Sequence, residues 1–147
     1  MVRSKEVVAQ LPSTLATGGA VALSPFDLAC KGRSVPMVWF YRETLDPAKL
    51  LLALRETLKS YPVLCGRYGG SPPDRIELCN AGVPVLVEHT DTTLADAVGH
   101  LPTSTAPSTF AIDAHAPFVP DKGIMDPDTG SPDAPLLSIK ITLLREA

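Results

Sequence analysis

The order of apolar and polar residues marks one long helix near the middle of the chain. Asp46 is a residue type preferred at helix N-caps, and Pro47 suits the first helical position. Pro62 disfavours helical geometry at the residue before it, so we expect the helix to end near Ser60. The apolar residues of this stretch follow the three-and-four spacing of one buried face: Leu51, Leu54, Leu58 and Tyr61. The pattern therefore predicts a helix over 46–60.

Three other segments have the composition of strands. Val35 to Arg42 (VPMVWFYR) is dense in β-branched and aromatic residues, which predicts a buried strand. Residues 137–143 alternate apolar with polar side chains, the period-two pattern of a strand. A shorter apolar run from Glu6 to Leu11 is ended by Pro12 and predicts a third strand. Strands and a helix together predict the α+β class, a mixed sheet with helices.

Turn-forming residues predict a hairpin in the second half of the chain. Its arms would be Arg75 to Cys79 and Val83 to His89, with Asn80, Ala81 and Gly82 as the turn between them. After the hairpin, Thr93 and Asp96 have the spacing of a helix N-terminus. We therefore expect one or two helical turns over Thr93 to His100.

Three stretches lack any clear periodicity. Ser13 to Leu23 is small and Gly-rich and is expected to be a surface loop, and Ser24 to Asp27 (SPFD) is expected to be a turn. Leu101 to Pro135 holds seven of the 15 prolines, which predicts an irregular excursion over about 101–135. The length of 147 residues suits one domain, and we assign it to residues 1–147.

The composition of the chain limits the partners and the cellular location that we expect for it. Thirteen Lys and Arg against 16 Asp and Glu give a net charge of −3, so nucleic acid is not an expected partner. No run of 18 apolar residues occurs and Glu6, Gln10 and Pro12 interrupt any leader-like segment, so no membrane partner is expected. The odd number of cysteines, three without a CxxC pair, predicts buried reduced thiols and a cytoplasmic location.

Catalytic and metal-ligating patterns are scarce. Ser104, Asp113 and His115 could be imagined as a nucleophilic triad, but they fall in the Pro-rich stretch with no scaffold to hold them. A calcium loop could be sought at Asp126, Asp128 and Asp133. However, Gly130 is one position early for such a loop, and no acidic residue closes it. The residues alone therefore predict no catalytic residue and no metal site.

Several segments together resemble the opening part of plant-type BAHD acyltransferases. LSPFD from Leu23 resembles the LSxxD segment near the start of these enzymes, and VPMVWFY resembles their next strand. YPVLCGRY from Tyr61 resembles their YPLAGRL, and DRIELCNAGVPVLVEHTD from Asp74 resembles their GRIEIDCNGEGVLFVEAE hairpin. LLSIKITLL resembles the strand that follows the proline-rich crossover of the family. The order and spacing of these segments agree along nearly the whole chain.

The resemblance implies a partial N-terminal domain of the CoA-dependent acyltransferase fold also seen in chloramphenicol acetyltransferase. In that family an HxxxD histidine takes a proton from an alcohol or amine, which then attacks an acyl-CoA thioester. The transferred group is an acyl group other than aminoacyl, such as hydroxycinnamoyl, and acyl-CoA is a co-substrate, so no bound cofactor is expected. The implied partners are acyl-CoA and a small-molecule acceptor, and the family enzymes are monomers.

The chain departs from the family at the catalytic base. The residues at the HxxxD spacing after His89, His100 and His115 are Thr93, Ser104 and Val119. In the family that motif follows the strand that LLSIKITLL resembles, and the sequence ends at Ala147. We therefore expect an acyltransferase fragment that is inactive alone. The alternative is a non-catalytic module of the same fold that binds a small molecule or a partner. Without later neighbours the last strand would have an exposed edge prone to self-association.

The candidate substrate-binding residues also come from the resemblance. Val35, Met37 and Trp39 match the TPSVYFY strand of the family and would share one face of a period-two strand, with Ser34 just before it. The alternative is that Val35, Met37 and Trp39 are simply core residues. Arg67, in the segment matching GRL, is expected to be a structural charge at a turn rather than a substrate contact.

Overall fold

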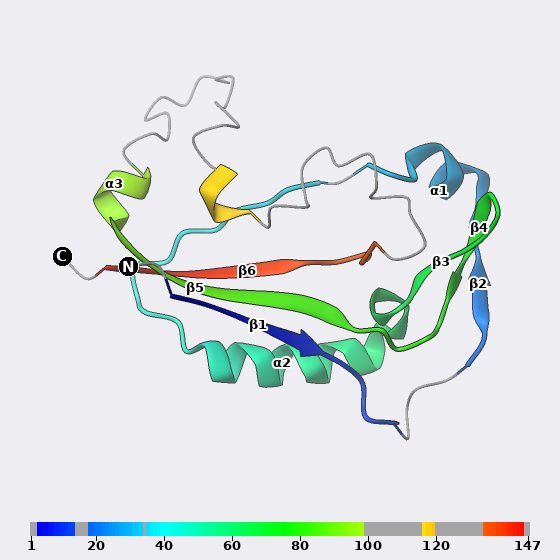
Figure 1. Ribbon diagram of the computed structural model, residues 1–147, viewed down its shortest axis with the longest axis horizontal. Coiled ribbons are helices and arrows are strands. Elements are labelled where there is room, and N and C mark those ends of the chain that lie inside the picture. The colour runs from blue at the N-terminus through cyan, green and yellow to red at the C-terminus, as the bar shows by residue number, and fades with distance from the viewer. Residues whose placement is uncertain (1–2, 14–17, 34, 99–115, 120–133, 146–147) are drawn as a thin grey trace.

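The computed structural model describes residues 3–13, 18–33, 35–98, 116–119 and 134–145. Within these ranges the chain is a small α+β protein with two three-stranded sheets and a few helices (Figure 1), so the predicted α+β class is confirmed. Sheet A has the strand order β1 (Arg3–Ala9), β5 (Val83–Thr93) and β6 (Ile139–Arg145). Sheet B has the order β2 (Ala20–Ala22), β4 (Pro73–Glu77) and β3 (Arg67–Gly70). The α-helices are α1 (Pro25–Cys30), α2 (Pro47–Ser60) and α3 (Leu94–Val98), and the short 3-10 helices are η2 (Pro62–Cys65) and η3 (Ala116–Phe118).

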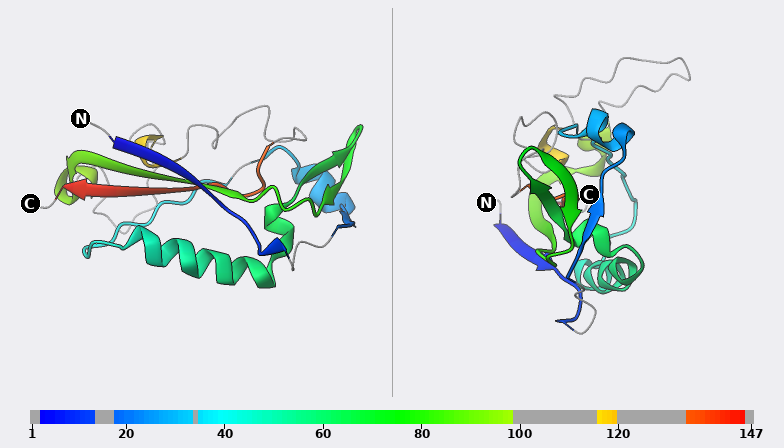
Figure 2. Two further views of the ribbon diagram at one scale, coloured as in Figure 1. Left: turned by 60° about the horizontal axis from the view of Figure 1, so that its bottom comes forward. Right: turned by 90° about the vertical axis from the view of Figure 1, so that its right-hand side faces the viewer.

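Helix α2 runs along sheet A and covers one of its faces (Figure 2). Leu58 of the helix is fully buried against Val83 and Val85 of β5. Ala9, Leu11 and Cys65 complete this core, and leucines of α2 and isoleucines of β6 pack around it. The hydrophobic effect of this one small cluster therefore joins the helix to sheet A.

The predicted helix is confirmed in its position and in its N-cap. The Asp46 carboxylate accepts hydrogen bonds from the backbone N–H of Ala48 at 2.9 Å and of Lys49 at 3.4 Å. These bonds satisfy two of the donors that every helix start leaves free. Tyr61 differs from the prediction because it is exposed: it is the C-cap, and its backbone has already left the helical region with a φ of −129°.

The predicted hairpin over Arg75–His89 is wrong. Its two arms lie in different sheets, because β4 pairs with β2 and β3, whereas β5 pairs with β1 and β6. The hairpin that does form joins β3 to β4. Strand β5 runs antiparallel to β1 and parallel to β6 (Figure 1), which local turn signals cannot reveal.

The predicted turn at Asn80–Gly82 is instead the crossing between the two sheets. The side chain of Asn80 accepts a hydrogen bond from the Leu11 N–H at 3.0 Å and donates one to the Leu11 carbonyl at 3.1 Å. Gly82 has a φ of +87°, and a Cβ there would lie 2.6 Å from a side-chain carbon of Val8. The Asn80 side chain therefore ties the crossing to the end of β1 rather than closing a tight turn.

Three short elements before residue 31 differ from the predictions in their bounds or in their type. The first strand begins at Arg3 and ends at Ala9, earlier than the predicted Glu6 to Leu11. The expected loop Ser13 to Leu23 contains β2, while the expected turn at Ser24 starts helix α1. Ser24 and Asp27 form a reciprocal capping box, and the two hydrogen bonds from Ser24 hold the pKa of the Asp27 carboxyl below its ordinary value.

The C-terminal strand and the short helix before the Pro-rich stretch are both confirmed. β6 covers most of the predicted 137–143 alternation and lies at one edge of sheet A. The Thr93 hydroxyl accepts a hydrogen bond from the Asp96 N–H at 3.2 Å and starts α3 as the spacing predicted. Of the predicted excursion over 101–135, only 116–119 and 134–135 lie within the described residues.

Candidate functional site

The segment Val35–Tyr41 carries three of the four predicted substrate-binding residues, and it is not the buried strand that its composition predicts. Its backbone is extended but pairs with no strand among the described residues. Every second side chain faces solvent. We call these four side chains, which are 56 to 78% exposed, the apolar ridge: Val35, Met37, Trp39 and Tyr41. Ser34, the fourth predicted residue, lies outside the described residues.

Two alternate residues of the same segment, Val38 and Phe40, are less exposed than the ridge, whereas Pro36 is exposed. Val38 and Phe40 are half-buried, and the Phe40 ring meets the Phe118 ring of η3 edge to face with centroids 5.4 Å apart. The predicted period of two is therefore present over Met37–Tyr41, where it divides an anchoring face from an exposed face. The alternative that Val35, Met37 and Trp39 are core residues is wrong, because all three are exposed.

The backbone of the segment Val35–Tyr41 runs on the β6 side of sheet A, opposite β1 (Figures 1 and 2). Strand β6 pairs only with β5 among the described strands, so its outer edge is unpaired there. Four large apolar side chains in a row on an unpaired segment form a surface that small monomeric proteins rarely expose. The predicted site residues are thus brought together as a surface and not as a pocket.

Classical catalytic groups are not assembled in the part of the chain that the structure describes. His89 is exposed on β5 and has no hydrogen bond to a hydroxyl, thiol or carboxylate among the described residues. No group of three His, Cys, Asp or Glu side chains within the described ranges could hold a metal ion. The candidate triad and calcium-loop residues, with His100, lie outside those ranges.

The three cysteines are free, as the odd count predicted, but only Cys65 is buried. Cys30 and Cys79 are exposed, so the expectation of burial is wrong for both. Burial raises the pKa of the Cys65 thiol, and a protonated thiol is a poor nucleophile. Cys65 therefore contributes to the core and not to covalent chemistry.

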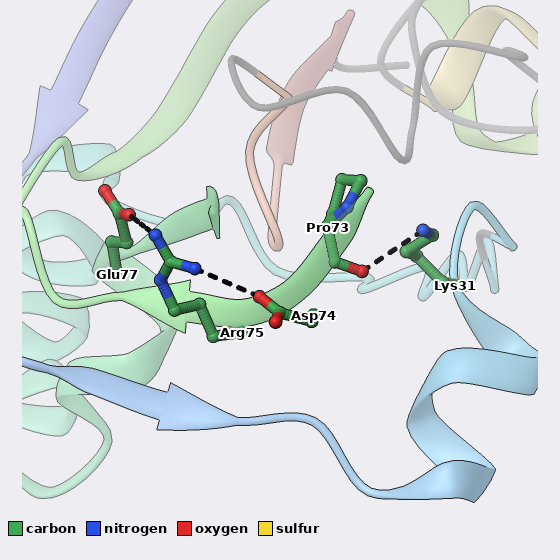
Figure 3. Close-up of polar contacts among 5 residues, drawn as sticks. All are labelled: Lys31, Pro73, Asp74, Arg75 and Glu77. Atoms are coloured by element: carbon green, nitrogen blue, oxygen red, sulfur yellow. Dashed lines mark hydrogen bonds and ion pairs between the residues drawn. The ribbon is translucent and has the colours of Figure 1, made fainter. Parts of the chain in front are cut away.

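A group of three charged side chains, Asp74, Arg75 and Glu77, lies on β4 (Figure 3). The Arg75 guanidinium bridges the carboxylates of Asp74 at 3.1 Å and Glu77 at 3.0 Å. Lys31, which follows α1, donates a hydrogen bond to the Pro73 carbonyl at 3.3 Å. Exposed ion pairs of this kind, here within a single strand, contribute little to stability. Arg75 supplies one positive charge to two carboxylates, so the three side chains together keep a net charge of −1.

Arg67 has the structural role that the sequence predicted. Its guanidinium donates hydrogen bonds to the backbone carbonyls of Gly66 at 2.8 Å and Gly82 at 3.0 Å. These bonds connect the start of β3 to the crossing between the sheets.

A second surface, which sequence reasoning missed, is an open groove of about 330 Å³ between β1 and α2. One wall comes from β1 and the residues after it, and the other from one stripe of α2: Val8, Gln10, Leu11 and Pro12 face Leu52, Arg55, Glu56 and Lys59. Leu52 is the one sequence signal for it, because this leucine falls outside the buried helical face yet is apolar. We call this feature the β1–α2 groove.

Comparison of the chain with family models and with curated proteins gives no match. None of the helices within the described residues combines the length and apolarity that a bilayer span requires.

Proposed function

We propose that this chain forms the N-terminal part of a CoA-dependent acyltransferase of the BAHD type, built on the chloramphenicol-acetyltransferase-like fold. The observation that carries the proposal is the apolar ridge beside the unpaired edge of β6. Both features lie on the same side of sheet A (Figure 1), where further strands and a second domain would complete the enzyme. The resemblance of five segments in family order supports the same assignment.

In the proposed enzyme, the ridge segment contributes to the acceptor side of the substrate site. Ser34, Val35, Met37 and Trp39 would line this site once additional polypeptide covers the ridge. The HxxxD histidine would come from that additional polypeptide, because no histidine of these 147 residues has aspartate at the required spacing. It would take the proton of an alcohol or amine, the acceptor oxygen or nitrogen would attack the thioester carbonyl, and CoA would leave as its thiol.

The purified 147-residue chain is expected to transfer no acyl group from p-coumaroyl-CoA or acetyl-CoA to phenolic or aliphatic acceptors. Product formation measured by chromatography should equal that of buffer alone. The same chain extended by the HxxxD-bearing remainder of a BAHD enzyme is expected to transfer acyl groups, and replacing the supplied histidine by alanine should abolish this. Enzyme-like turnover by the 147 residues alone would contradict the proposal, because it would require a base that the assignment does not contain.

The second candidate function is a non-catalytic binding module, and the exposure of Trp39 and Met37 on the ridge favours it. Trp39 is the single tryptophan of the chain and is 65% exposed, so its emission reports only on the ridge. If the ridge binds a small aromatic, p-coumarate should shift the Trp39 emission to shorter wavelength in a saturable way, because the ligand excludes water from the indole. Met37→Asp should weaken this response, whereas Leu28→Asp on α1, which is also exposed, should not. An emission spectrum that does not change with p-coumarate contradicts the binding module and leaves the acyltransferase proposal in place.

A further inference from the structure

The β1–α2 groove lies at the edge of sheet A opposite the ridge, and neither proposed function uses it. Strand β1 pairs only with β5 within the described residues. No backbone hydrogen bond from Ser4–Ala9 to anything but β5 is found in that part of the chain. Unpaired edge strands are the surfaces on which extended peptides add as a further strand.

The groove runs beside this edge and offers places for side chains. Leu11 is buried, and Val8 and Leu52 are exposed, so the two walls both present apolar carbon. A volume of about 330 Å³ is at the low end of the range for small-ligand pockets, and because the groove is open it would leave much of a compact ligand in solvent. A ligand that fits must therefore gain further contacts outside the groove. The backbone edge of β1 can provide these contacts to an extended chain and not to a compact small molecule.

The charged side chains on the α2 wall of the groove indicate which charge a ligand would carry. Lys59 is neutralised by Glu56, whose two carboxylate oxygens lie 2.7 and 2.6 Å from the ammonium nitrogen. Arg55 has no ion-pair partner among the described residues and lines the same groove. A guanidinium prefers a carboxylate, which it can bind through two parallel hydrogen bonds.

We propose that the β1–α2 groove binds an extended acidic peptide segment of another protein. The segment adds as a strand to the outer edge of β1, places apolar side chains against Leu11 and Leu52, and places one carboxylate at Arg55. This proposal is independent of the acyltransferase assignment, because it rests on the opposite edge of sheet A.

The test is selection of a phage-displayed library of random decapeptides on the full 147-residue chain. Selected peptides should share a Glu or Asp flanked by alternating apolar residues. Selection on Arg55→Glu should instead enrich Lys or Arg at that position. Lys49→Glu makes the same charge change on α2 outside the groove and should select the same acidic peptides as the unchanged chain. A synthetic selected peptide should lose about fivefold in affinity when its acidic residue is replaced by glutamine, as expected for one exposed charge pair.

Hydrogen exchange then locates the peptide. Binding should slow amide exchange in Ser4–Ala9 of β1 and leave β6 unchanged. The proposal is overturned by the absence of enrichment, by the same acidic peptides emerging from Arg55→Glu, or by protection of β6 instead of β1. It is also overturned if β1 is protected in a dimer without peptide, because the occupant would then be a second copy of the chain.

Discussion

Leu58→Ala is expected to lower the free energy of unfolding by about 3 kcal/mol, within the range for leucine deletions in protein cores. Leu58 has no exposed surface and is the one fully buried side chain among the described residues of α2. It packs in the cluster that joins this helix to β5 and to the end of β1. Removing this side chain leaves a cavity among its buried neighbours, and α2 loses its one fully buried contact in the cluster, beside the partly buried Leu51 and Leu54.

Urea unfolding followed by far-UV circular dichroism measures this loss. Leu52→Ala is the matched control, because it removes the same atoms from the same helix at a side chain that is 61% exposed. Its effect should stay within about 0.5 kcal/mol, as for most surface substitutions. Equal losses for the two variants would show that α2 does not pack on sheet A through Leu58.

Glu88→Gln is expected to cost about 3 kcal/mol, the low end of the range for breaking a buried ion pair. The Glu88 carboxylate lies 2.7 Å from the Lys140 ammonium and joins β5 to β6. The side chains of Lys140 and Glu88 are only 7% and 21% exposed, so water reaches the Lys140 ammonium poorly once the carboxylate is lost. The variant would leave a charged ammonium buried without a counter-charge.

The control for this variant is Glu56→Gln on α2. It breaks the ion pair in which the Glu56 carboxylate lies 2.6 Å from the Lys59 ammonium, a similar distance, but both side chains are exposed to solvent. It should cost less than about 0.5 kcal/mol, because exposed pairs contribute little. The double variant Glu88→Gln with Lys140→Met should regain most of the loss, since no charge then remains buried. A loss of stability in the double variant as large as in Glu88→Gln would contradict this explanation of the pair.

Local chemistry was sufficient to predict the elements whose ends are marked by single residues. Asp46 with Pro47 and Pro62 bounds α2, and Thr93 with Asp96 starts α3. The alternation over 137–143 predicted β6 in the same way. In each case the deciding interactions are between residues only a few positions apart, so they are present in the sequence itself.

Strand partners could not be predicted in this way. Asn80–Gly82 has the composition of a hairpin turn, yet Asn80 bonds to Leu11, 69 positions away, and β4 and β5 separate into two sheets. Turn composition describes which backbone angles are available and not which strands meet. The parallel pairing of β5 with β6 is equally absent from local patterns.

For the candidate surfaces, too, the sequence predicts some features and only the tertiary structure decides the others. The continuous apolar run over Val35–Tyr41 suggested a buried strand, but burial depends on whether another element covers the segment. Leu52 and Arg55 carry no sequence signal of a groove beyond one apolar residue outside the buried face. Capping and periodicity are properties of neighbouring residues, so the chain encodes them locally. Pairing, burial and the two exposed surfaces result from contacts between distant residues, which form when α2 packs on sheet A and Asn80 joins the two sheets.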